Sequence, residues 1–322
     1  MVAQHREHFA APDPRFPLSQ SDVIIAGFPV DAQPSLPQWA SVVHLDPFPD
    51  SEALETVARD YRLCCVLTRD ETGPAGDLAL IEQLLRHMAA GVQVVRVEGG
   101  EDLIPLLIQV ARAVDPAMVV LAAGAGSHAH PHLREDRRLY SCEPEQLRDA
   151  LVHPGEVPSL YGELTAASGL PGIDGIDPAL PEDQQLWMRL ATLAVRLAAR
   201  GVPVLHWAEV LSLEQDLEAL VGARSASAAF HPLSEGEVLA SEPQLVALRR
   251  ASPEGAVVLC LHNLSRDYGE YRHRKDLFPW PETGVLRELI SGDLVVPTSE
   301  GALFSLELEP WESLWLSFSD EE

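Results

Sequence analysis

The sequence has few basic residues for its length, and this shortage limits what the protein can bind. Lysine and arginine together number 23, against 49 aspartate and glutamate residues, which gives a formal net charge of −26. Because phosphate binding requires clustered positive charge, the balance argues against nucleic acid as a partner. An acidic surface of this kind favours solubility.

The sequence also lacks long apolar runs. None reaches the length needed to span a membrane, and the first residues lack the apolar core of a secretory signal. We therefore expect a cytoplasmic protein without a membrane partner. With 322 residues, of which 46% are hydrophobic, the chain can bury a sizeable core as one large domain or two ordinary ones.

Cysteine is scarce as well. The four cysteines are Cys64, Cys65, Cys142 and Cys260, and none forms a CxxC pair. The sequence therefore predicts neither a disulfide framework nor a zinc site of that type. We expect no metal and no cofactor, and we expect the adjacent Cys64 and Cys65 to be buried as free thiols.

The stretch from Val92 to Ala123 contains one complete strand–helix–strand unit. Val92–Val97 is a β-branched run between glycines, residues 103–114 carry apolar side chains at helical spacing, and Met118–Leu121 is a second apolar run. Two such continuous runs around a helix indicate buried parallel strands. In a barrel built from such units, functional residues lie at the strand ends. Here those ends carry Arg96, Glu98 and Ala123.

The same alternation continues through residues 21–225, and we expect an irregular arm at 1–20. Near Ala229 the pattern changes to the two-residue alternation of an antiparallel β-sandwich, which we expect over 226–322. Expected strands before this point are Val23–Ala26, Ser41–Leu45, Leu63–Leu67 and Val204–Trp207; expected helices are Asp77–Ala90, Gln185–Ala199 and Leu211–Val221; expected strands after it are Gln244–Leu248, Ala256–Leu261, Ala302–Leu306 and Ser313–Phe318.

Several segments resemble glycoside hydrolase family 13, the α-amylase superfamily, and its sucrose-phosphorylase-like branch in particular. SDVIIAGFP, VVHLDPFPD and the Arg96-Val97-Glu98 strand end are similar to the first, second and fourth barrel strands, and AFHP, ALRRASPEGAVVLCLHNLS, ELISGD and LELEPWESLWL are similar to the branch's C-terminal β-domain. The resemblance implies an α/β fold: a (β/α)8 TIM-type barrel followed by an antiparallel β-sandwich. The family's domain B has no room in residues 70–91, which implies a shortened barrel.

The resemblance also implies roles for individual residues. The family's nucleophile, an aspartate, corresponds to Glu98, with Arg96 preceding it, and its acid/base glutamate corresponds to Ala123. Ile173-Asp174-Gly175-Ile176 resembles its His-Asp-Gly-Ile, so Asp174 is either the carboxylate that stabilises the transition state or a turn residue. The family also places a substrate-side histidine at the spacing of His128.

Two further segments allow more than one interpretation. His128, His130 and His132 alternate, so an extended backbone would put them on one side, where they could hold a metal; the alternative is an exposed loop on the active-site side. The basic and aromatic segment at 272–281 favours a loop packed by its aromatic rings over a nucleic-acid contact.

The substitutions at the strand ends predict lost turnover. Retaining glycoside hydrolysis requires a nucleophile and a protonated acid, and general acid catalysis contributes about 10²–10⁴-fold. Ala123 cannot donate a proton, Glu98 is one methylene longer than aspartate, and Thr68-Arg69 replace the family's sugar-holding Asn-His. We expect a degenerate, non-catalytic member that binds a saccharide or a partner protein.

Two alternatives remain at this stage. The first is a reduced but active α-glucosyl hydrolase, transferase or phosphorylase in which Glu101, Asp102 or a histidine of 128–132 replaces the acid. The second is an accessory structural subunit of an active homologue, either as a homo-oligomer or with that enzyme as partner.

Overall fold

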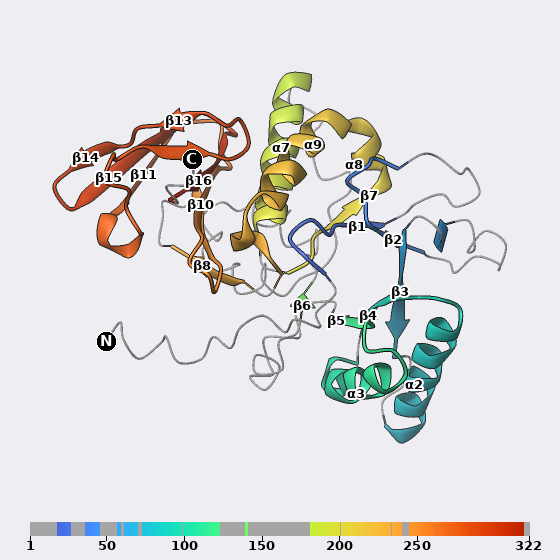
Figure 1. Cartoon of the computed structure of the whole chain (residues 1–322). Helices are drawn as coiled ribbons and strands as arrows, with labels where there is room; N and C mark the ends of the chain where they lie inside the picture. The colour runs from blue at the N-terminus through green and yellow to red at the C-terminus, as the bar shows by residue number, and fades with distance from the viewer. Residues whose placement is uncertain are drawn as a thin grey trace.

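The computed structural model describes the chain in separate stretches: residues 18–26, 36–45, 57–58, 61–69, 73–98, 100–122, 139–140, 181–199, 201–232, 234–239 and 245–318. A parallel sheet and its helices come first, and an antiparallel β part follows (Figure 1).

The first part is built on a parallel sheet in the order β6-β5-β4-β3-β2-β1-β7. Strands consecutive in sequence lie side by side, as in a (β/α) barrel and unlike a doubly wound sheet. The last strand pairs with the first, through Ile24 and Val204, as barrel closure requires. The strands are β1 Ile24–Ala26, β2 Val42–His44, β3 Arg62–Thr68, β4 Val94–Glu98, β5 Val119–Ala122, β6 Leu139–Tyr140 and β7 Val204–His206.

Both faces of this sheet are buried, which explains its continuous apolar runs. Alternate strand residues, including Val43 and Val95, pack with the helices in one large core. The others, including Ile24, Cys64 and Val94, form a separate cluster on the inner face. The expected strands of this part are present to within two residues at each end.

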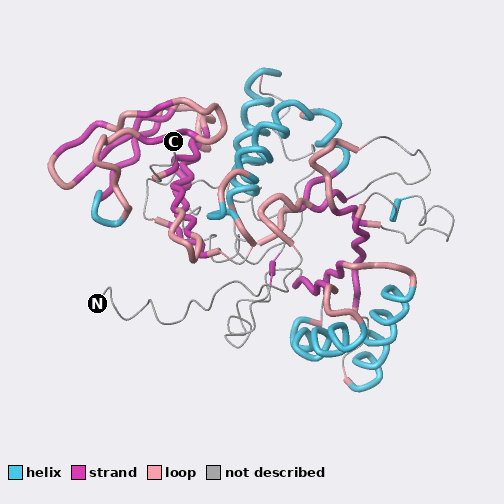
Figure 2. The backbone as a smooth tube through the Cα atoms, in the orientation of Figure 1, coloured by secondary structure: helices cyan, strands magenta, loops and turns pink. Residues whose placement is uncertain are grey.

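Helices cover the outer face of the sheet (Figure 2). In α2, Leu80 and Leu84 are buried one turn apart, while Pro74 occupies the first turn, where its missing N–H costs nothing. The expected single helix over 211–221 is wrong, because Leu213 leaves helical geometry at φ −135° and ψ 26° and two helices meet there. The helices are α2 Pro74–Ala89, α3 Ile104–Val114, α7 Glu182–Ala198, α8 Trp207–Ser212 and α9 Glu214–Ser225.

The second part consists of two antiparallel sheets, ordered β13-β12-β16-β10-β9-β8 and β11-β15-β14. A core that includes Leu259, Tyr271 and Phe304 fills the space between them, as in a β-sandwich. The strands are β8 Glu235–Val238, β9 Leu245–Ala251, β10 Val257–Asn263, β11 Gly269–Arg274, β12 Leu286–Glu288, β13 Leu294–Val295, β14 Thr298–Glu300, β15 Leu303–Leu308 and β16 Ser313–Ser317.

The two parts share one hydrophobic core. Val246, Val258 and Trp315 face away from the sandwich interior and belong to the same cluster as the buried side of α7. Phe230 packs against Trp315 in a tilted arrangement with ring centroids 4.8 Å apart. Helices α7 and α9 therefore lie between the parallel sheet and the β-sandwich (Figure 1).

These observations confirm a partial TIM-type barrel followed by an antiparallel β domain; the boundaries near residues 20 and 225 stay predictions. The loop expected over 272–281 is wrong for Arg272–Arg274, because these residues end β11. The aromatic rings of the segment pack as expected: Phe278 and Trp280 both contact Phe304 and Phe318. None of the helices in the described stretches is long and apolar enough to cross a bilayer.

Candidate functional site

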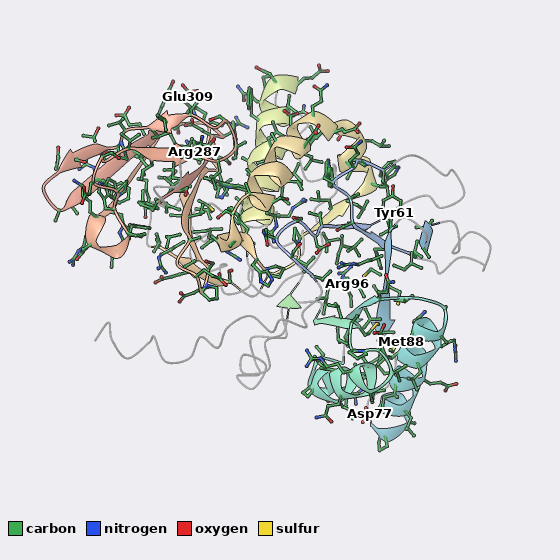
Figure 3. The ribbon with its side chains drawn as sticks, in the orientation of Figure 1. Tyr61, Asp77, Met88, Arg96, Arg287 and Glu309 are labelled. Atoms are coloured by element: carbon green, nitrogen blue, oxygen red, sulfur yellow. The ribbon has the colours of Figure 1, made fainter. Side chains whose placement is uncertain are left out.

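Two of the residues expected to carry function, Arg96 and Glu98, lie at the C-terminal end of β4 in the parallel sheet. Arg96 is only 6% exposed and sits in β4, within the first part of the chain (Figure 3). It is two positions on from Val94, so strand alternation puts it on the inner face of the barrel. Burial raises the pKa of the nearby Cys64 thiol to about 12, and the positive charge of Arg96 opposes part of that rise.

Glu98 is the last residue of β4, and its backbone pairs with that of Thr68 at the end of β3. On the other side of β4, Val97 pairs with Ala122, the last residue of β5. In the sequence, Val97 is followed by Glu98 and Ala122 is followed by Ala123. This register brings the ends of β4 and β5 together, whereas the convergence of Glu98 and Ala123 stays a prediction.

Ala123, His128 and Asp174 lie outside the described residues, as do His130 and His132. Within the described stretches, no group of three or more histidine, cysteine, aspartate or glutamate residues is placed to hold a metal ion.

Arg69 follows β3 and ties together the two loops at this edge of the sheet. Its guanidinium donates to Asp102 at 3.0 Å and also pairs with Asp77, in the first turn of α2. The Arg69 side chain is 10% exposed, whereas that of Asp102 is 54% exposed. Arg69 therefore points toward the helix layer and away from the inner face that carries Arg96.

His44 is a residue of this edge that sequence reasoning missed. It is the last residue of β2, is 7% exposed, and pairs in register with Cys64, so it shares the inner face with Arg96. Its position two residues after Val42, in an otherwise apolar strand, was the signal that could have identified it.

The described edge can bind polar groups but holds few candidates for acid–base chemistry. His44, Thr68 and Arg96 supply donors on the inner face of neighbouring strands, and the β4 end contributes the Glu98 position. Asp102, a possible replacement acid, is already engaged by Arg69. These donors could contact a hydroxyl-rich or anionic ligand.

No protein-family model matches the chain, and no curated protein is similar enough in sequence to match it. Solved structures do match. The α-amylase of Geobacillus thermoleovorans, solved with acarbose, aligns with a TM-score of 0.66 and 8% identity over 94% of this chain and 99% of that one. A maltogenic α-amylase of Thermotoga neapolitana aligns with a TM-score of 0.64 and 12% identity over 93% and 99%.

The likeness extends beyond amylases. A candidate α-galactosidase of Bacteroides fragilis aligns with a TM-score of 0.59 and 11% identity, covering 88% of this chain and 72% of that one. At these identities the matches establish a shared fold. The chain therefore has the barrel and β-domain architecture found in α-amylase-family enzymes, which confirms the coarser part of the resemblance.

Proposed function

We propose that this protein is a degenerate relative of α-amylase-family enzymes that binds a saccharide at the mouth of its barrel without cleaving it. We assign it to the sucrose-phosphorylase-like branch, with a shortened barrel that lacks domain B, and to cytoplasmic carbohydrate metabolism. The observation that carries the proposal is the register of β4 and β5, whose strand ends lead to Glu98 and Ala123.

The argument against turnover is geometric. Retaining enzymes hold two carboxyl groups about 5–5.5 Å apart, one as nucleophile and one as acid. Here the residue that follows β5 in the sequence is Ala123, which has no proton to give. A glutamate nucleophile would also place its oxygen farther from the strand, and a displacement of about 1 Å can cost roughly a hundredfold in rate. Both changes weaken the same transition state.

The ion pairs of Arg69 with Asp77 and Asp102, which we call the Arg69 clamp, support the same conclusion. In the related family a histidine at this place helps to hold the sugar, whereas Arg69 is committed to Asp77 and Asp102. The branch assignment is supported by the β-domain: the segment ALRRASPEGAVVLCLHNLS forms β9 and β10, and LELEPWESLWL covers the turn into β16.

A second candidate function is a weak α-glucosyl enzyme. Arg96 shares a strand with Glu98 and lies two residues before it, where its charge would keep a carboxylate ionised and nucleophilic. Glu101 or a histidine of 128–132 would then have to replace the missing acid. A substrate with a good leaving group would reveal such an activity, because it does not require the acid.

Calorimetric titration with glucose, sucrose and maltose tests the proposal. We expect saturable binding of at least one sugar, and Arg96→Leu should weaken that binding if the inner face forms the pocket. A second test is the double variant Glu98→Asp with Ala123→Glu, which restores the family's pair of carboxylates. A folded double variant with neither turnover nor glucose binding would mean that the pocket is gone, and the protein would then act through its surface, as an accessory subunit or partner.

A further inference from the structure

A groove lies where α7 and α9 meet the β-sandwich. We call it the α7–α9 groove. Its volume is about 520 Å³, within the range of roughly 300–1,000 Å³ that is common for ligand pockets. Its lining residues are Trp187, Leu190, Ala191, Ala194, Asp216, Ala219, Leu220, Ile290 and 309–313.

Helical periodicity builds two of its walls. Trp187, Leu190, Ala191 and Ala194 recur at three- and four-residue steps along one face of α7, and Asp216, Ala219 and Leu220 do so on α9. The small side chains of the alanines leave the space between the helices open. Trp187 remains 54% exposed at the rim, where it presents a ring to solvent.

The third wall is a rigid turn that carries Trp311 and two carboxylates (Glu309 is labelled in Figure 3). Asn263 holds this turn, because its side-chain amide Nδ2 donates to the Glu309 carbonyl at 2.8 Å. The Trp311 amide donates to the Ser265 carbonyl at 3.2 Å, and Trp311 has φ 62°, which non-glycine residues seldom adopt. The turn therefore presents its side chains in a fixed arrangement.

The groove is negatively charged. Asp216, Glu309 and Glu312 line it, and none of its lining residues in the described stretches is basic. Burial raises the pKa of Glu312, and the neighbouring carboxylates of Glu309 and Glu288 add to the rise. A cation bound in the groove would relieve this repulsion, which a neutral ligand would not do.

We propose that the α7–α9 groove binds a segment of a partner protein that presents an arginine side chain. A guanidinium stacks on aromatic faces and pairs with carboxylates through several donors at once, so it matches two tryptophans and three carboxylates better than an ammonium does. Apolar neighbours such as Leu190 and Ile290 would contact the rest of the segment. The proposal goes beyond the saccharide-binding role and does not depend on it.

The probe is a fluorescein-labelled peptide of alternating arginine and serine, compared with a peptide that has neutral citrulline at every arginine position. Binding to the full-length protein is followed by fluorescence anisotropy. The groove variant is Asp216→Asn with Glu309→Gln. The matched control is Glu282→Gln with Glu300→Gln, which removes the same charge from exposed positions of the β-sandwich. Thermal unfolding confirms that each variant folds.

We expect saturable binding of the arginine peptide that the groove variant weakens roughly tenfold or more, since hydrogen bonds to charged groups are lost. Trp187→Ala should weaken it too, and the control pair should not. Equal loss in both double variants, equal binding of the citrulline peptide, or no saturable binding overturns the proposal. Maltotriose binding that requires Trp187, without peptide binding, would overturn it in favour of a sugar. None of these results bears on the barrel mouth, which is tested separately.

Discussion

The guanidinium of Arg69 lies 3.0 Å from the carboxylate of Asp102, and this ion pair joins the loops that follow β3 and β4. Arg69 stands where the resembling family has a histidine that helps to hold the sugar, and here it pairs with carboxylates at the edge of the sheet.

Removing this clamp should destabilise the fold measurably. Arg69 is nearly buried and bonds two carboxylates, so Arg69→Ala should lower the free energy of unfolding by about 1–3 kcal/mol, measured by urea denaturation. Arg86→Ala is the control, because its pair with Glu82 is largely exposed and exposed pairs contribute about 0–1 kcal/mol. Equal effects of the two substitutions would show that the clamp has no structural role.

His262 should make stability depend on pH. Its ring is fully buried, with Nδ1 2.9 Å from the Ser313 hydroxyl, and burial lowers its pKa to about 3. Below about pH 6.5, His262 is therefore protonated in the unfolded chain but stays neutral in the folded chain. The free energy of unfolding thus decreases as the pH falls from 6.5 toward 3.

The expected slope from this one group is about 1.4 kcal/mol per pH unit. Unfolding measured between pH 7 and pH 5 should show a shallower decrease in His262→Gln than in the unaltered protein. Comparing the two proteins cancels the contributions of the other titrating groups. One of these is His231, because burial lowers its pKa as well. Parallel pH profiles would contradict the assignment.

The three described cysteines should be inert in the folded protein. Cys64, Cys65 and Cys260 are buried free thiols, and burial raises the pKa of each, so little thiolate forms at neutral pH. A Cys142→Ser variant should therefore not react with Ellman's reagent until denatured, when all three thiols should react. Rapid labelling of the native variant would show that one of them is accessible.

Trp315 should couple the β-sandwich to the helix layer. It is fully buried and packs against Phe230, so Trp315→Ala should cost about 3–5 kcal/mol in unfolding free energy. Tyr268→Ala, at a residue 73% exposed, should have little effect. If Trp315→Ala unfolded one part and left the other intact, the shared core would not be cooperative.

The sequence predicted local structure well and spatial partners poorly. The β-branched run at 92–97 identified β4 because strands buried on both faces require such runs. The break at Leu213 was missed, because the apolar spacing continues through it and only the backbone angles reveal the change. The spacing of apolar residues alone does not show where one helix ends and the next begins.

The candidate site was predicted only as far as local pattern reaches. Strand ends gave the positions of Arg96 and Glu98, since polar residues after an apolar run are visible in one sequence. The Arg69–Asp102 pair joins residues 33 positions apart, and the groove is lined by Trp187 and Trp311 from different elements. Tertiary packing fixes such contacts, so no periodicity could show them.

The central claim is that the barrel has lost its proton donor with Ala123, and turnover of two substrates tests it most directly. Sucrose needs an acid for its leaving group, whereas α-glucosyl fluoride does not. We predict no measurable hydrolysis or phosphorolysis of sucrose by the purified protein, and at most slow turnover of the fluoride. Sucrose turnover within about a hundredfold of ordinary family rates, given that general acid help is worth about 10²–10⁴-fold, would contradict the account.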